Sequence, residues 1–127
     1  MSLELIGSFK QQLLEIGFKG DICLDTPTRL LNATDNSIYE VMPLAVIQPR
    51  DANDIGLLLQ VSNLVEYQSL NFCARGGGTG TNGQSLSNGL VIDFSRYMNK
   101  IVQVDVANKT AIVEAGVILS DLNRELA

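Results

Sequence analysis

The stretch that decides the fold is NFCARGGGTGTNGQSLSNGLVIDFS, residues 71–95. An apolar run enters it, five glycines follow within eight residues, and a second apolar run leaves it. Its segment GTGTNG, residues 78–83, satisfies the dinucleotide-binding pattern GxGxxG. Read from Gly78, GTGTNGQS also satisfies the phosphate-loop pattern GxxxxGK[ST], except that Gln84 stands in place of the lysine. The question is therefore what kind of site, if any, these glycines form.

Both nucleotide patterns require a helix directly after their glycines, because the N-terminus of that helix holds the phosphate groups. Residues 84–95 instead pass through serine and glycine, which favour turns, into the apolar run GLVIDFS. The phosphate-loop pattern also requires a positive charge beside the phosphates, which Gln84 does not carry. The sequence therefore argues against a Rossmann site and against a phosphate loop.

Two interpretations of the glycines stay open. The first is a plain turn between two strands, since glycine is common in turns. The second is a backbone cradle, in which consecutive N–H groups bind an anion without a helix. Each glycine costs about 0.5–1 kcal/mol in backbone entropy, and about two to five residues are enough for a turn, which favours the cradle. Thr79, Thr81 and Asn82 add polar donors, and Arg75 stands at the entrance.

Two helices are predicted before the first strong strand pattern. Residues 3–16 place apolar side chains at helical spacing, which predicts an amphipathic helix. TPTRLLNA, residues 26–33, predicts a short helix with Thr26 as its N-cap and Pro27 at its first position. Between them, DICLD, residues 21–25, is too short to classify.

The middle of the chain reads as one βαβ unit. LAVIQP, residues 44–49, is a short apolar run that predicts a buried strand ending at Pro49. Asp51 then caps a helical pattern that continues to residue 67, and SLNFCAR, residues 69–75, predicts a second strand. A strand, a helix and a strand over about 30 residues form a crossover unit, so we expect these two strands to be parallel neighbours.

The C-terminal part changes to antiparallel patterns. GLVIDFS, residues 89–95, is the strongest strand pattern, and KIVQVDV and TAIVEAG flank the turn signal ANKT, residues 107–110. We expect these two segments to form an antiparallel hairpin with one solvent-exposed face. SDLNRELA, residues 120–127, predicts a helix with Ser120 as N-cap, since Leu119, Leu122 and Leu126 fall at helical spacing. Because no capping glycine follows it, we expect residues 1–127 to be a fragment of a longer protein. The predicted fold class is therefore α+β, a parallel βαβ core with flanking helices plus an antiparallel hairpin.

The bulk composition limits the classes of partner. The net charge of −5 repels nucleic-acid backbones, and no apolar run approaches the ~20 residues that span a bilayer, so we expect neither nucleic-acid binding nor a transmembrane segment. The chain has no histidine, which excludes a Ser-His-Asp triad, and Cys23 and Cys73 lack metal or iron–sulfur spacing. We therefore expect two reduced thiols, no metal site and no catalytic residue in this chain. The expected location is cytoplasmic, with peripheral attachment to the inner membrane face as the alternative.

Three motifs together resemble a known family. RGGGTGTNGQ, GLVIDFSRYMNKI and VEAGV are similar to the FAD-binding domain of the vanillyl-alcohol oxidase and p-cresol methylhydroxylase superfamily. TRLLNATDNSIYE, residues 28–40, and MPLAVIQPR, residues 42–50, resemble one branch of it, the bacterial FAD-linked D-2-hydroxyacid dehydrogenases related to D-lactate, glycolate and D-2-hydroxyglutarate dehydrogenases. The resemblance runs from about residue 17 to the end. It implies that residues 1–127 are the N-terminal portion of one FAD-binding domain of the p-cresol methylhydroxylase type.

The resemblance also implies a cofactor site. In such proteins the loop that corresponds to residues 75–83 wraps the FAD pyrophosphate. The residues of this chain that match cofactor-binding positions are Arg75, Gly76, Gly77, Gly78, Thr79, Gly80, Thr81, Asn82, Gln84, Ser85, Pro49, Gly116 and Val117. Some relatives tether FAD through a histidine, whose position is occupied here by Thr79, so the resemblance implies a non-covalently bound FAD.

The function implied by the resemblance is that of a flavin-dependent dehydrogenase. The full-length enzyme would oxidise a D-2-hydroxyacid, with its substrate residues, and any iron–sulfur cluster, in sequence after Ala127; these residues alone would be inactive. The alternative is a non-catalytic nucleotide-binding, phosphate-binding or interaction module with a glycine-rich connector. The sequence leaves open which hydroxyacid and electron acceptor are used, the oligomeric state, whether these residues bind FAD alone, and the role of residues 33–39.

Overall fold

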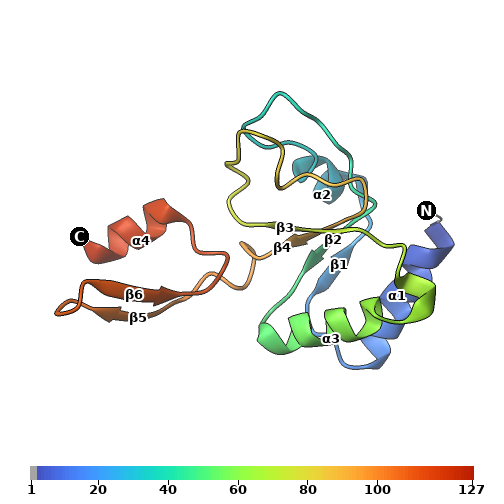
Figure 1. Ribbon diagram of the computed structural model, residues 1–127, viewed down its shortest axis with the longest axis horizontal. Helices are drawn as coiled ribbons and strands as arrows, with labels where there is room; N and C mark the ends of the chain where they lie inside the picture. The colour runs from blue at the N-terminus through green and yellow to red at the C-terminus, as the bar shows by residue number, and fades with distance from the viewer. Residues whose placement is uncertain (1–2) are drawn as a thin grey trace.

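A computed structural model describes residues 3–127 of the chain. Most of these residues gather around a four-stranded sheet, while the C-terminal hairpin and helix extend to one side of it (Figure 1). The mixed parallel sheet and the separate antiparallel hairpin confirm the predicted α+β class.

The sheet consists of β1 (Asp21–Cys23), β2 (Ala45–Gln48), β3 (Phe72–Arg75) and β4 (Leu90–Asp93) in the order β1-β2-β4-β3. β4 pairs in parallel with both β2 and β3, and β1 pairs antiparallel with β2. The prediction that the strands of the βαβ unit are neighbours is therefore wrong, because β4 lies between them. β4 is buried along its whole length, whereas β3 is only partly buried. The most apolar strand thus takes the centre of the sheet and leaves β3 at its edge.

Two helices cover one face of the sheet, α1 (Leu3–Glu15) and α3 (Ala52–Ser62) (Figure 1). The predicted amphipathic helix is confirmed, since Ile6, Phe9 and Leu13 are all buried. The Phe9 ring packs edge-on against Tyr67 with centroids 5.1 Å apart. Tyr67 ends the short 3-10 helix η1 (Val65–Tyr67), which replaces the last predicted turn of α3.

Two aspartates stabilise the N-terminus of α3 by accepting backbone hydrogen bonds. Asp51 is the N-cap as predicted, and its Oδ1 accepts a hydrogen bond of 3.0 Å from the backbone N–H of Asp54. The Asp54 carboxylate is fully buried and accepts 2.9 Å hydrogen bonds from the backbone N–H groups of Lys19 and Arg50. Because a buried carboxylate requires such donors, Asp54 links the start of α3 to the segments that precede β1 and follow β2.

Two helix starts differ from the prediction. α2 (Thr26–Leu31) is capped by Asp25 rather than by Thr26, since the Asp25 Oδ2 accepts a 2.9 Å hydrogen bond from the Thr28 N–H. A carboxylate is a stronger acceptor than a hydroxyl at this position. α4 (Leu119–Leu126) begins one residue before the predicted cap, Ser120, and makes no side-chain capping bond.

The hairpin of β5 (Ile101–Asp105) and β6 (Thr110–Val113) is antiparallel, as predicted. Its burial differs from the prediction, because the apolar positions are exposed together with the polar ones. Val102 is 63% and Ile112 57% exposed. Within residues 3–127, none of the helices is both long and apolar enough to cross a membrane.

Candidate functional site

The glycine loop, defined here as residues 75–85, leaves the C-terminal end of β3. The chain then reaches β4 without forming a helix or strand, although β3 and β4 are parallel neighbours. Gly78 and Gly83 have positive φ angles of 66° and 74°, a conformation that L side chains rarely adopt. Among the described residues, no helix lies between Gly83 and β4, so this loop lacks the helix N-terminus that the Rossmann and phosphate-loop patterns require.

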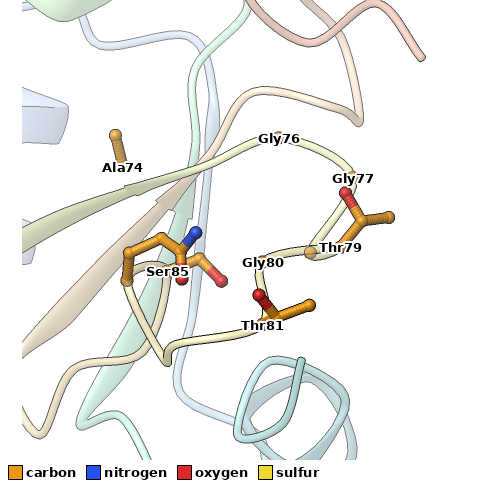
Figure 2. Close-up of a pocket in the computed structure, with 9 residues that line it drawn as sticks. Ala74, Gly76, Gly77, Thr79, Gly80, Thr81 and Ser85 are labelled. Carbon is orange, nitrogen blue, oxygen red and sulfur yellow. The ribbon is translucent and has the colours of Figure 1, made fainter. Parts of the chain in front are cut away.

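The glycine loop curves around a cavity of about 460 Å³ (Figure 2). The wall is mostly backbone, with short polar side chains between the glycines. The residues that line it are Ala74, Gly76, Gly77, Gly78, Thr79, Gly80, Thr81, Gln84 and Ser85. None of these side chains carries a negative charge, although the chain as a whole is acidic. Ser85 lines the cavity, and its Oγ is buried without a hydrogen-bond partner among the described residues.

The side chain of Gln84 folds back into the glycine loop. Its Oε1 accepts a 3.0 Å hydrogen bond from the Asn82 N–H, and a Cβ added at Gly80 would lie 2.5 Å from the Gln84 Cδ. Gln84 therefore holds the turn together, and a side chain at residue 80 would require the Gln84 side chain to move. Asn82 contributes its backbone to this turn and does not line the cavity.

A second cavity, of about 610 Å³, lies next to the first and shares Gly76 and Gly77 with it. Its lining includes Gln48, Arg75 and Asp93, the last residues of the three parallel strands. The carboxyl ends of parallel strands are the usual ligand-binding edge of such sheets. The two cavities meet at Gly76 and Gly77, where the wall is polar backbone without side chains. Together they can accept an extended ligand whose central part is polar.

Asp93 is held by local partners within the second cavity. Its Oδ1 accepts hydrogen bonds from the Ser95 N–H at 2.9 Å and from the Ser95 Oγ at 2.6 Å. Its Oδ2 accepts a longer bond of 3.3 Å from the Gln48 Nε2. These contacts tie the ends of β2 and β4 together at the cavity edge.

Arg75 is the first residue of the glycine loop and the last residue of β3. It lines the second cavity and not the first. Its Nη2 donates a 2.8 Å hydrogen bond to the carbonyl oxygen of Thr34, and its Nη1 is buried without a partner among the described residues. A Cβ added at Gly78 would lie 2.3 Å from this Nη2. The guanidinium therefore packs directly against Gly78, and a side chain at residue 78 would have to displace it.

The three predicted site residues outside the glycine loop lie less close to the cavities. Pro49 is fully buried after β2 and lines neither cavity. Gly116 is buried, and a Cβ added there would lie 2.1 Å from the Phe94 carbonyl oxygen, so the two backbones are in close contact. Val117 follows it and is partly buried. The neighbouring Ile118 does line the second cavity, and its Cδ1 lies 3.0 Å from the Cβ position of Gly77.

Sequence reasoning missed several residues that shape the site. Nothing in the sequence pointed to Ile118 except that it follows Gly116 and Val117, the two residues matched to cofactor-binding positions. Residues 33–39, whose role the sequence left open, lie against the glycine loop, since the Asn36 N–H donates a 3.1 Å hydrogen bond to the Gly80 carbonyl oxygen. Composition and periodicity carry no information on such contacts between distant segments.

The two cysteines are not arranged for nucleophilic chemistry. Burial raises the pKa of the Cys73 thiol, which the positive charge of Arg75 only partly offsets, and the Cys73 Sγ donates a 3.1 Å hydrogen bond to the Gln84 carbonyl oxygen. Burial, followed by the charges of Asp25 and Asp21, also raises the pKa of Cys23. Both thiols are therefore protonated at neutral pH.

Comparisons with known proteins agree with this geometry. A family model described as an FAD binding domain matches residues 43–127. The chain is 44% identical to D-2-hydroxyglutarate dehydrogenase of Escherichia coli (strain K12) over 98% of its length, and it spans only 12% of that relative. It is 33% identical to the glycolate oxidase subunit GlcD of Bacillus subtilis (strain 168), covering 91% of this chain and 24% of that one. The solved structure of p-cresol methylhydroxylase with substrate bound superposes with a TM-score of 0.79, at 14% identity, over 99% of this chain and 25% of that chain. The last similarity confirms the predicted fold.

Proposed function

This chain belongs to the FAD binding domain family, and from that premise we propose that the glycine loop holds the FAD pyrophosphate in a D-2-hydroxyacid dehydrogenase. In this proposal, residues 1–127 are the N-terminal portion of one FAD-binding domain in a longer polypeptide. The short share of the dehydrogenase relative that the chain spans, 12%, supports this assignment. Residues that bind and deprotonate the hydroxyacid then lie outside this portion.

The observation that carries the proposal is the composition of the first cavity. Its wall is made of backbone from Gly76 to Thr81, with no carboxylate among its lining residues. Backbone N–H groups in such a loop can bind an anion without a helix. The unpartnered hydroxyl of Ser85 adds a donor that is already desolvated. A diphosphate fits these donors, and the two adjoining cavities offer space to the groups on either side of it.

The chain's own residues would bind and orient the cofactor. FAD supplies the hydride-accepting ring when it is bound. The glycine loop holds the diphosphate in place, and Gln84 keeps the loop closed through its bond to the Asn82 N–H. Thr79 occupies the position of the tethering histidine, and the chain contains no histidine, so the proposed attachment is non-covalent.

The relatives favour one substrate within the proposed class. Enzymes named D-2-hydroxyglutarate dehydrogenase from Escherichia coli and Haemophilus influenzae are 44% and 45% identical to this chain. A D-2-hydroxyacid with a second carboxylate is therefore the first substrate to test. Any iron–sulfur cluster would belong to sequence outside residues 1–127. Cys23 and Cys73 are far apart in the sequence, and their thiols donate hydrogen bonds to different partners, Gln48 and Gln84.

The test is a flavin assay on the natural-length polypeptide that contains this sequence. The purified protein should show the flavin absorption bands, release FAD on denaturation, and become bleached by D-2-hydroxyglutarate but not by the L-enantiomer. A folded protein that neither contains nor binds FAD would refute the proposal. Bound FAD that no hydroxyacid reduces would instead support a non-catalytic nucleotide-binding module.

A further inference from the structure

We propose that residues 34–39, called the brace below, position the glycine loop for the FAD pyrophosphate. This inference rests on the proposed function, because it assigns a role within the same site. The brace forms an arch beside the glycine loop (Figure 1), although about forty residues separate the two segments in the sequence.

The brace is closed at its base and stiffened by its own polar groups. Thr34 and Glu40 form an isolated antiparallel bridge, and the Val41 N–H donates a 2.8 Å hydrogen bond to the carbonyl oxygen of the fully buried Ala33. Inside the arch, the Asp35 Oδ1 accepts a 2.8 Å bond from the Ser37 N–H. These hydrogen bonds within and beside the segment help to define its shape.

A single backbone bond connects the brace to the middle of the glycine loop. The Asn36 N–H donates to the Gly80 carbonyl oxygen at 3.1 Å. In a planar trans peptide the C=O and the following N–H point in opposite directions. Binding the Gly80 carbonyl to the brace therefore turns the Thr81 N–H to the other side, and Thr81 lines the first cavity. The bond thus orients a donor that we assign to the pyrophosphate.

Two further contacts join the glycine loop to the brace, one made by Arg75 of the loop and one made by Tyr39 of the brace. The Arg75 Nη2 bonds to the Thr34 carbonyl oxygen, while its guanidinium packs against Gly78. The Cδ2 of the Tyr39 ring lies 3.1 Å from the Cβ position of Gly83. Glycine-rich backbone has the largest conformational freedom to lose when a ligand orders it. A loop already held at three points loses less on binding, and so binds more tightly.

The test compares two substitutions at Asn36 in the natural-length polypeptide. Asn36→Pro removes the N–H that donates the hydrogen bond to the Gly80 carbonyl oxygen. Asn36→Ala keeps this N–H and changes only an exposed side chain. Loss of one hydrogen bond and its ordering effect should weaken FAD binding roughly tenfold in N36P. N36A should bind within about twofold of the parent. Flavin fluorescence gives the dissociation constant.

A second pair guards against a folding defect in the proline variant. Tyr39→Ala removes the ring beside Gly83, and Tyr39→Phe keeps it, because the contact is made by a ring carbon. Y39A should bind FAD about threefold more weakly than Y39F. A purely structural role would not move the ³¹P resonances of bound FAD, whereas a misplaced loop should shift them in N36P and Y39A.

The outcomes separate this inference from the proposed function. A parent protein that does not bind FAD would refute the proposed function itself. A parent that binds FAD, together with N36P and Y39A variants of unchanged affinity and unchanged ³¹P resonances, would overturn the brace alone. If N36P does not fold, the comparison of Y39A with Y39F decides the question.

Discussion

Strand β4 and the glycine loop come from one short stretch of sequence, yet they use side chains in opposite ways. Leu90, Val91 and Ile92 of β4 are buried and locate the strand by packing in the centre of the sheet. The glycine loop omits side chains, so its backbone can line a cavity. The difference teaches that residues of β4 determine stability, whereas residues of the glycine loop determine binding. Substitutions in the two regions should therefore affect different measurements.

The largest effect is expected in β4. Leu90→Ala should reduce the free energy of unfolding by about 2–5 kcal/mol, because Leu90 is fully buried and its truncation leaves a cavity. The control is Leu59→Ala, in which the same truncation is made at a side chain that is 55% exposed, with an expected change within about 0.5 kcal/mol. Urea unfolding of the apoprotein measures both. Equal losses would show that β4 is not the stabilising centre.

Gly77→Val is expected to separate binding from stability. The new side chain would project where the two cavities meet, and its nearest neighbour is the movable Cδ1 of Ile118, 3.0 Å from the added Cβ. FAD affinity should fall at least about a hundredfold, or about 2.7 kcal/mol, while the unfolding midpoint of the apoprotein changes little. Flavin retention through gel filtration is the first measurement.

Gly56→Ala is the matched glycine control for that variant. Gly56 lies inside α3 with open space at its Cβ position. The alanine should stabilise the apoprotein by about 0.5–1 kcal/mol, because glycine is a poor helix former, and should leave FAD affinity unchanged. If Gly77→Val retains FAD as well as Gly56→Ala does, the glycine loop is not the pyrophosphate site.

Ser85→Ala should give a smaller effect of the same kind. The Ser85 Oγ is buried without a partner in the absence of ligand. Removal of an unsatisfied buried hydroxyl should leave apoprotein stability unchanged or raise it by about 1 kcal/mol. If this hydroxyl donates to the pyrophosphate, FAD affinity should fall roughly five- to tenfold. A variant with reduced apoprotein stability and normal FAD affinity would contradict both expectations.

The smallest expected effect concerns the brace and depends on pH. Hydrogen bonds from Ser37, followed by the charge of Arg75, lower the pKa of Asp35 below its ordinary value of 3.8. The ionised form is therefore favoured in the folded state. The resulting stabilisation is complete above the ordinary pKa and is lost as the pH falls through the lower folded-state pKa.

Asp35→Asn tests this sign. Its unfolding midpoint should lie below that of the parent at pH 6, and the two values should converge as the pH approaches 2. Thermal unfolding of the apoprotein at several pH values between those limits makes the comparison. Parallel curves over the whole range would show that Asp35 does not stabilise the brace through its charge.

The fold was predictable where the signal is local. The apolar runs predicted β2, β3 and β4, and the Asp51 cap predicted the start of α3. The order of the strands was not predictable in this way. It depends on which apolar run is stabilised most when both faces of its strand are buried in the middle of the sheet, and a local pattern does not give that comparison. β1 was missed because three residues carry no periodicity. Thr26 is the predicted cap of α2 because Pro27 follows it, whereas the structure uses Asp25, one residue earlier.

The sequence by itself determined that the glycine loop lacks a following helix and that its backbone is unobstructed, because both properties follow from which residues are neighbours in the chain. Only the tertiary structure decided what holds that loop. Arg75 meets Thr34, Gly80 meets Asn36, and Gly77 meets Ile118. These contacts join segments that lie far apart in the sequence, so no local pattern predicts them.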